Sequence, residues 1–172
     1  MTLVITKVGD DQGWAFDMRK VKTDLFHLIS IFLADAQYAE AIENEQDPLW
    51  SIASVGEPEI TRLLISTAAI GRVIDDRESF LLSKTSNYCG SIEVDGVSSP
   101  LNLREAFNKI IHADAFSLVI SDSDSEFEHL SAEIMLHGKQ RSKDWHVNLD
   151  IVEYVREYSR HLTSLRKDET FT

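Results

Sequence analysis

The spacing of the apolar residues changes from a helical period to a strand period near residue 90. Between residues 17 and 83 apolar residues recur every three or four positions, which is typical of amphipathic helices. Beyond residue 90 they alternate with polar residues in short segments, which is typical of strands with one buried face. The chain must therefore combine helices with a sheet, and we expect one α+β domain over residues 1–172.

The segment of about 17–83 is predicted to be an antiparallel helical hairpin. Its first helix starts near Asp17 and ends in the polar stretch Glu43–Pro48. The second starts near Pro58, because proline is favoured at the first helical position. Small residues from Thr67 to Gly71 would let a neighbouring element approach closely. The first helix is apolar on more than one side, which leaves a homodimer open.

The segment of about 88–167 is predicted to be a small antiparallel sheet with additional helices. Asp95-Gly96 is a strong signal for a tight hairpin turn. In a second hairpin we expect Leu136 to lie opposite Trp145, with a polar turn between them. The segment 92–97 is expected to contain this first hairpin turn, and strands are expected at 115–121, 129–137 and 145–151, with a short strand or frayed arm at 3–8. Further helices should follow Asn102 and Asp150, each of which has Glu three positions later.

The charge distribution favours a basic partner. The net charge is −12 and the pI is near 4.8, so phosphates would be repelled and no direct nucleic-acid ligand is expected. No Lys or Arg lies between Lys22 and Arg62, although acidic residues are frequent there. Such a surface can attract a cationic protein or simply serve solubility. The candidate partner-binding residues are Asp35, Glu40, Glu43, Glu45, Asp47, Glu57 and Glu59.

Cysteine content and hydropathy suggest a cytoplasmic protein without a membrane partner. Cys89 is the single cysteine, so no internal disulfide can form, and no basic neighbour activates its thiol. The N-terminal residues lack the pattern of a signal peptide. The longest apolar stretch, Leu25–Ala34, is interrupted by His27 and Ser30 and is too short to span a bilayer.

Two groups of residues have metal-ligand chemistry, but we expect neither to bind a functional metal. His137, His146, Glu133 and Asp150 should share the outward face of the second hairpin, where a flat sheet keeps ligands apart. Asp122–Glu126, followed by Glu133, resembles the spacing of a calcium loop. Phe127 stands where that loop needs glycine, so a solvated acidic turn is the favoured interpretation. No cofactor is predicted.

The segment Asn108-Lys109-Ile110-Ile111-His112 resembles the helical Arg-polar-x3-His signature of the HEPN ribonucleases over five residues. Phe107 stands where that family has arginine, and Arg104 lies about one turn earlier. The resemblance implies an enzyme acting on RNA or nucleotides through Arg104, Asn108 and His112. That family is all-helical, whereas strands are predicted directly after His112.

The remaining feature is a basic turn, Gly138–Lys143, which could contact a phosphate or an acidic protein or could be a solvated hairpin tip. No phosphate-binding glycine loop, nucleophile elbow, CxxC or HExxH motif occurs in the sequence. The sequence therefore favours an acidic protein-binding domain. The best hypothesis is an immunity- or antitoxin-like stoichiometric inhibitor of a basic protein, such as a toxin nuclease. The HEPN-like enzyme is the alternative.

Overall fold

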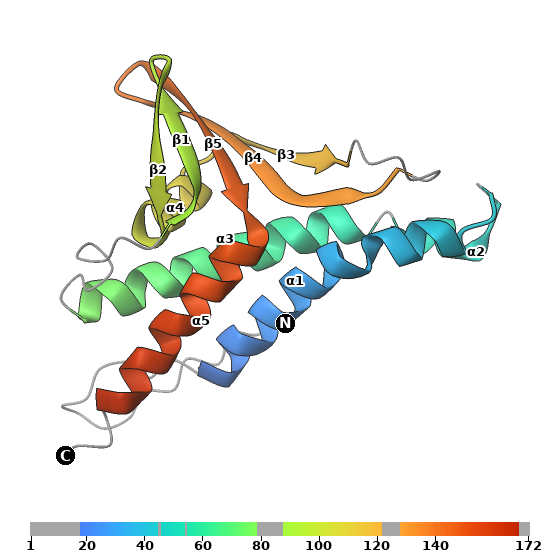
Figure 1. The fold of residues 1–172 in the computed structure, drawn as a ribbon, viewed down its shortest axis with the longest axis horizontal. Helices are drawn as coiled ribbons and strands as arrows, with labels where there is room; N and C mark the ends of the chain where they lie inside the picture. The colour runs from blue at the N-terminus through green and yellow to red at the C-terminus, as the bar shows by residue number, and fades with distance from the viewer. Residues whose placement is uncertain (1–17, 45, 54, 79–87, 122–127, 169–172) are drawn as a thin grey trace.

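The computed structural model describes residues 18–44, 46–53, 55–78, 88–121 and 128–168. Over these residues the chain is an α+β fold in which helices pack against one face of a five-stranded antiparallel sheet (Figure 1). The predicted fold class is thereby confirmed, whereas the segment 3–8 lies outside the described residues. The helices are α1 (Met18–Ala41), α2 (Pro48–Ala53), α3 (Gly56–Arg77), α4 (Leu103–Ile111) and α5 (Ile151–Asp168). The strands are β1 (Tyr88–Val94), β2 (Val97–Asn102), β3 (Ala115–Ile120), β4 (Leu130–Gln140) and β5 (Lys143–Asp150).

The predicted helical hairpin is formed by α1 and α3, which run in opposite directions, with α2 in the connection between them (Figure 1). We did not predict α2, which begins where Asp47 accepts a hydrogen bond from the backbone N–H of Leu49 at 2.9 Å. Helix α3 begins at Gly56 rather than at Pro58. Pro58 is nevertheless within the first turn, where a backbone N–H would have no partner inside the helix.

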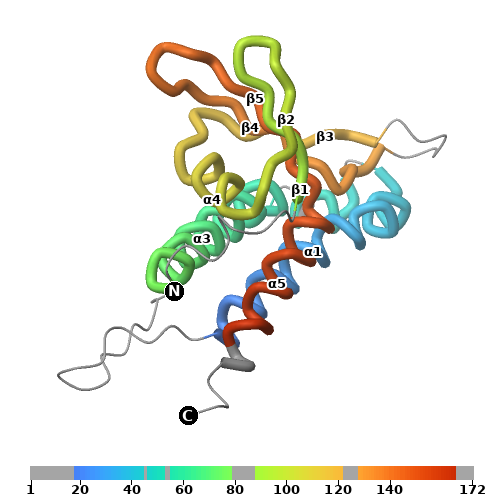
Figure 2. The backbone as a smooth tube through the Cα atoms, turned by 60° about the vertical axis from the view of Figure 1, so that its left-hand side comes forward, coloured from blue at the N-terminus to red at the C-terminus, as the bar shows by residue number. Residues whose placement is uncertain are grey.

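The sheet has the order β2-β1-β5-β4-β3, so that two hairpins lie next to each other through the β1–β5 pairing. Asp95 and Gly96 have φ angles of 52° and 76°, as the predicted tight turn requires. Arg141 and Ser142 form a second two-residue turn, with φ angles of 50° and 66°. The two tips lie side by side in both views (Figures 1 and 2), and an ion pair joins Lys143 to Asp95.

The predicted pairing of β4 with β5 was wrong by two residues. Leu136 lies opposite Val147, and Trp145 lies opposite Gly138. A shift of two residues keeps each side chain on its predicted face, because the side-chain period of a strand is two. Gly138, predicted to lie in the turn, is part of β4 and lies opposite Trp145. The absence of a side chain leaves room for the indole, because a Cβ at this position would lie 2.6 Å from Trp145 Cε2.

An aromatic cluster joins α4 and α5 to the small face of α3. The ring of Phe107 lies 4.9 Å from that of Tyr158 and 6.0 Å from that of Tyr154, measured between centroids. The hydroxyl of Tyr158 donates to the carbonyl of Thr67 at 3.0 Å. Phe107 and Tyr158 both approach Gly71, where a side chain would collide with them. The close approach predicted for Thr67–Gly71 is thus confirmed.

The two predicted helix starts in the second half of the chain are also confirmed. Asn102 accepts a hydrogen bond from the backbone N–H of Glu105 at 2.8 Å, at the start of α4. Asp150 accepts from the backbone N–H of Glu153 at 2.9 Å, at the start of α5. In each case a side chain satisfies a backbone donor that the helix itself leaves without a partner.

Candidate functional site

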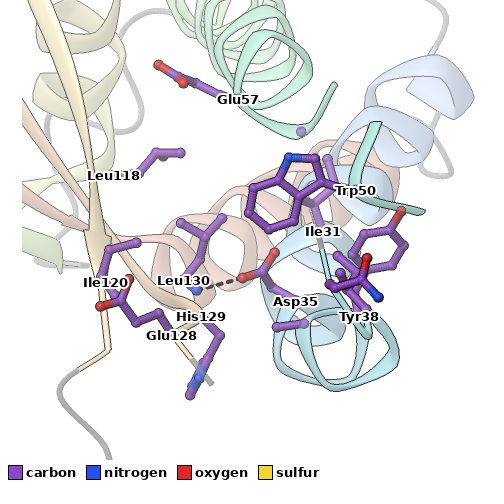
Figure 3. Close-up of a pocket in the computed structure, with 14 residues that line it drawn as sticks. Ile31, Asp35, Tyr38, Trp50, Glu57, Leu118, Ile120, Glu128, His129 and Leu130 are labelled. Carbon is purple, nitrogen blue, oxygen red and sulfur yellow. Dashed lines mark hydrogen bonds between the residues drawn. The ribbon is translucent and has the colours of Figure 1, made fainter. Parts of the chain in front are cut away.

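A groove of about 600 Å³ lies between the helical hairpin and the β3–β4 edge of the sheet (Figure 3). Trp50 of α2 lines it with its side chain 53% exposed, and Leu118 and Ile120 of β3 form the opposite side. The hydroxyl of Tyr38 donates to the carbonyl of Leu49 at 2.9 Å, which holds α2 against α1. An exposed indole beside an apolar wall is a typical protein-binding surface.

Three carboxylates line the same groove: those of Asp35, Glu57 and Glu128. Asp35 accepts a hydrogen bond from the backbone N–H of Leu130 at 2.6 Å, so its charge also fixes α1 to the start of β4 (Figure 3). Glu57 and Glu128 are exposed, and within the described part of the chain neither forms an ion pair. The groove therefore combines an apolar surface with negative charge.

The other predicted partner-binding residues lie outside this groove. Asp47 accepts backbone hydrogen bonds from Leu49 and Glu43, and these bonds lower the pKa of its carboxyl group. Glu59 forms a bidentate pair with Arg62, which lowers the pKa of Glu59. Glu40 and Glu43 are exposed away from the groove, and Glu45 lies outside the described residues. The structure thus brings together Asp35 and Glu57 but not the whole predicted set.

Trp50, Tyr38 and Glu128 were not predicted from the sequence as site residues. The sequence signal for Trp50 was the apolar triplet Pro48-Leu49-Trp50, which interrupts the acidic segment between the two predicted helices. Helix α2 has only 6 residues, too few to show a helical period, so the triplet gave no indication of its structure. Glu128 is distant in sequence from the acidic stretch and reaches the groove only through the fold.

The three residues of the HEPN-like alternative are divided between two places. Arg104 forms ion pairs with the buried Asp75 and with Asp76, and so links α4 to α3. Asn108 and His112 both line a second cavity, located between α4 and the β4–β5 hairpin. Arg104 is not among the residues that line that cavity.

The two histidines of the outward sheet face lie closer together than we predicted. His137 is directly opposite His146, and their Nδ1 atoms are 2.7 Å apart, so one ring donates and the other accepts. The predicted alignment of Leu136 with Trp145 would have placed Met135 opposite His146 and Glu133 opposite Asn148, and both of these pairings are wrong. In the observed register Met135 lies opposite Asn148, and Glu133 lies opposite Asp150.

No group of three or more His, Cys, Asp or Glu residues is arranged to hold a metal ion within the described ranges. Glu133 accepts a hydrogen bond from the amide of Asn148 at 3.1 Å, and Asp150 caps α5. The acidic segment Asp122–Glu126, which resembles a calcium loop, lies outside the described residues.

Cys89 lies in the core, in surroundings typical of a structural cysteine rather than a catalytic one. Its side chain is fully buried, and its thiol lies 3.7 Å from the carbonyl oxygen of Leu101 as a weak donor. Burial raises the pKa of the thiol to about 12. A nucleophilic cysteine needs the opposite shift, toward the thiolate at neutral pH.

Comparison with protein-family models, curated proteins and solved structures gave no match. Among the described residues, no helix has both the length and the apolar character needed to cross a membrane. Phe26 and Leu33 on α1 are 66% and 61% exposed, and the homodimer stays a prediction. The fold and the site define an α+β domain with an acidic, partly apolar groove.

Proposed function

We propose that this chain is a protein-binding domain that covers a basic partner stoichiometrically, as an immunity protein or antitoxin covers a toxin. The observation that carries the proposal is the groove, where the exposed indole of Trp50 stands among the carboxylates of Asp35, Glu57 and Glu128. The proposal places both proteins in the cytoplasm and involves no cofactor.

The chemistry of the groove suits an arginine- or lysine-bearing segment of a partner. A guanidinium group can stack on an indole and also form bidentate hydrogen bonds with a carboxylate. Glu57 and Glu128 approach the groove from the helical side and the strand side respectively, so a cationic side chain between them would meet negative charge on both sides. Leu118 and Ile120 would contact the apolar stem of such a side chain.

The acidic residues outside the groove would assist association. Long-range attraction increases the association rate, and salt screens it, because the Debye length falls from about 30 Å at 0.01 M to about 8 Å at 0.15 M salt. Glu40 and Glu43 are exposed and can act at this range without touching the partner. A toxin nuclease would fit this scheme, since proteins that bind nucleic acid carry basic surfaces.

The test begins with affinity capture from the native host, followed by purification of the captured protein and kinetic measurement of its binding. Three double charge reversals are compared, each of which changes the net charge from −12 to −8. One reverses groove residues (Glu57→Lys with Glu128→Lys). A second reverses acidic residues outside the groove (Glu40→Lys with Glu43→Lys). The control reverses two distant exposed acids (Glu93→Lys with Asp114→Lys).

We expect the groove variant to lose about tenfold or more in affinity, with a faster dissociation rate. Trp50→Ala should lose affinity without a change in salt dependence, because it removes contact area rather than charge. The Glu40/Glu43 variant should slow association and flatten its salt dependence. Equal effects of the groove variant and the distant control would contradict the proposal, because net charge alone would then account for binding.

The alternative, an enzyme acting on RNA or nucleotides, predicts a different result. Its residues Asn108 and His112 share a cavity, but Arg104 is engaged with Asp75 and Asp76. Turnover of RNA by the purified chain, abolished by His112→Ala and unaffected by the groove variant, would favour this alternative.

A further inference from the structure

A second cavity, of about 640 Å³, lies between α4 and the tip of the β4–β5 hairpin, at the opposite end of β4 from the groove. In Figure 2, α4 lies below the two adjacent hairpin tips. The lining of the cavity contains three cationic side chains, those of Lys109, Lys139 and Arg141, and one carboxylate, that of Glu105. With neutral histidine, the lining keeps two net positive charges on a chain whose total is −12.

Lys109 is the buried cation in this lining, and its amine contacts neutral groups. Its side chain is 8% exposed, and its amine lies 4.5 Å from the centroid of the Trp145 ring. The amine donates to Gln140 Oε1 at 3.2 Å, and among the described residues it forms no ion pair. Burial lowers the pKa of Lys109, which the nearby Glu105 only partly offsets. A buried charge without an ion-pair partner is costly, and an anion bound beside it would relieve that cost.

The other two cations are presented by the hairpin tip. Lys139 is exposed and lies 3.5 Å from Asp144, a surface contact that contributes little. Arg141 has a φ angle of 50° although it is not glycine, and no ion pair engages it within the described part of the chain. This φ angle belongs to the two-residue turn at the hairpin tip, where both central residues have positive φ, and the turn places Arg141 in the lining of the cavity.

We propose that this cavity binds a small phosphorylated molecule of about the size of a sugar phosphate or mononucleotide. A phosphate monoester carries about −1.5 to −2 charges at pH 7, which matches the two net positive charges of the lining. Lys109 and Arg141 are the phosphate ligands, and Asn108 and His112 can hydrogen-bond to hydroxyl groups on the remainder of the molecule. The volume lies within the range of small-molecule sites, roughly 300–1,000 Å³, and exceeds what a bare phosphate needs.

The proposal is tested by calorimetric titration of the full chain with ribose 5-phosphate, adenosine monophosphate and inorganic phosphate. Ribose and adenosine are the controls without phosphate, and a short RNA oligonucleotide is the macromolecular probe. We expect at least one of the two phosphorylated molecules to bind with a Kd below about 1 mM and to raise the Tm. The molecules without phosphate should bind at least tenfold more weakly.

Three variants locate the site. Lys109→Met keeps an unbranched side chain but removes the charge above the Trp145 ring, and Arg141→Asn keeps a residue that tolerates positive φ. Each should weaken binding of the phosphorylated probe at least tenfold. Lys143→Gln removes one charge from the same hairpin but lies outside the lining, and it should change the Kd less than twofold.

Three outcomes would overturn the proposal. The first is no binding of either phosphorylated molecule at millimolar concentration. The second is binding that survives Lys109→Met together with Arg141→Asn, or that Lys143→Gln weakens equally. The third is binding of the RNA oligonucleotide alone, which would assign the cavity to a nucleic-acid backbone instead. Circular dichroism and thermal melts of each variant separate loss of the site from loss of the fold.

Discussion

The replacement Gly71→Ala in α3 should change the free energy of unfolding in two opposite ways, through helix propensity and through core packing. In a helix interior alanine is favoured over glycine by about 1 kcal/mol, so a substitution at an open site would stabilise the protein. Gly71 is buried where α4 and α5 converge on α3. An added Cβ would lie 2.6 Å from Phe107 Cε2 and 2.7 Å from the hydroxyl oxygen of Tyr158, closer than real Cβ contacts.

The packing effect should prevail. Inserting a carbon into a well-packed core costs about 1–3 kcal/mol. Moving Tyr158 also disturbs its buried hydrogen bond to Thr67, and an unsatisfied buried hydroxyl costs about 1–3 kcal/mol. After subtraction of the gain in helix propensity, we expect a net loss of about 3 kcal/mol. In a chain of this size that corresponds to a decrease in Tm of roughly 6–12 °C.

Urea denaturation followed by circular dichroism measures the change in the free energy of unfolding. Gly56→Ala is the matched control, since it lies in the same helix with no atom within 4 Å of the added Cβ, and it should be neutral or slightly stabilising. Adding Phe107→Leu to Gly71→Ala should recover part of the loss, since the two sites are in contact. If Gly71→Ala is as stable as the unmodified protein, the convergence of α4 and α5 on Gly71 is wrong.

Three further predictions test other parts of the fold. Trp145→Ala should cost about 3–5 kcal/mol because the indole is 1% exposed, whereas the exposed His146→Ala should stay within roughly 0.5 kcal/mol; equal losses in urea denaturation would contradict the observed sheet faces. Cys89 should resist a thiol reagent at pH 8 in the native protein and react after unfolding, since burial raises its pKa to about 12; rapid native labelling would show that the site is open. Burial lowers the pKa of His161, so the unfolded state binds more protons than the folded state below about pH 6.5. Stability should therefore fall as the pH decreases below that value. If the pH profile of stability is unchanged in His161→Asn, this histidine is not the cause.

Local signals in the sequence predicted most of the fold, because they act over a few residues. The Asp95-Gly96 turn, the capping residues Asn102 and Asp150 and the change of period near residue 90 all correspond to observed features. Each of these features depends on interactions between residues that are close together in the sequence. A sequence folds to one structure when such local preferences agree with the tertiary fold, as they do here.

Features that depend on contacts between distant segments were not predictable in the same way. The sequence of the second hairpin allowed two registers with the same buried face, and the fit of Gly138 against the Trp145 ring is decided only in three dimensions. Likewise, the groove joins Trp50 and Glu57 to Glu128, which is far away in the sequence. The sequence showed the acidic stretch, but the fold selects which of its residues meet an apolar surface.

The two surfaces proposed for binding have opposite charge, and strand β4 explains how one small chain can carry both. Leu130, at the start of β4, lines the acidic groove, whereas Gln140, at its end, lines the cationic cavity. A strand of 11 residues spans about 35 Å at roughly 3.4 Å per residue. This distance is several times the Debye length of about 8 Å at 0.15 M salt, so the two surfaces do not neutralise each other through the solvent. Any coupling between partner and anion would have to pass through the sheet, and it would be reciprocal: an anion that strengthens partner binding must itself bind more tightly to the complex.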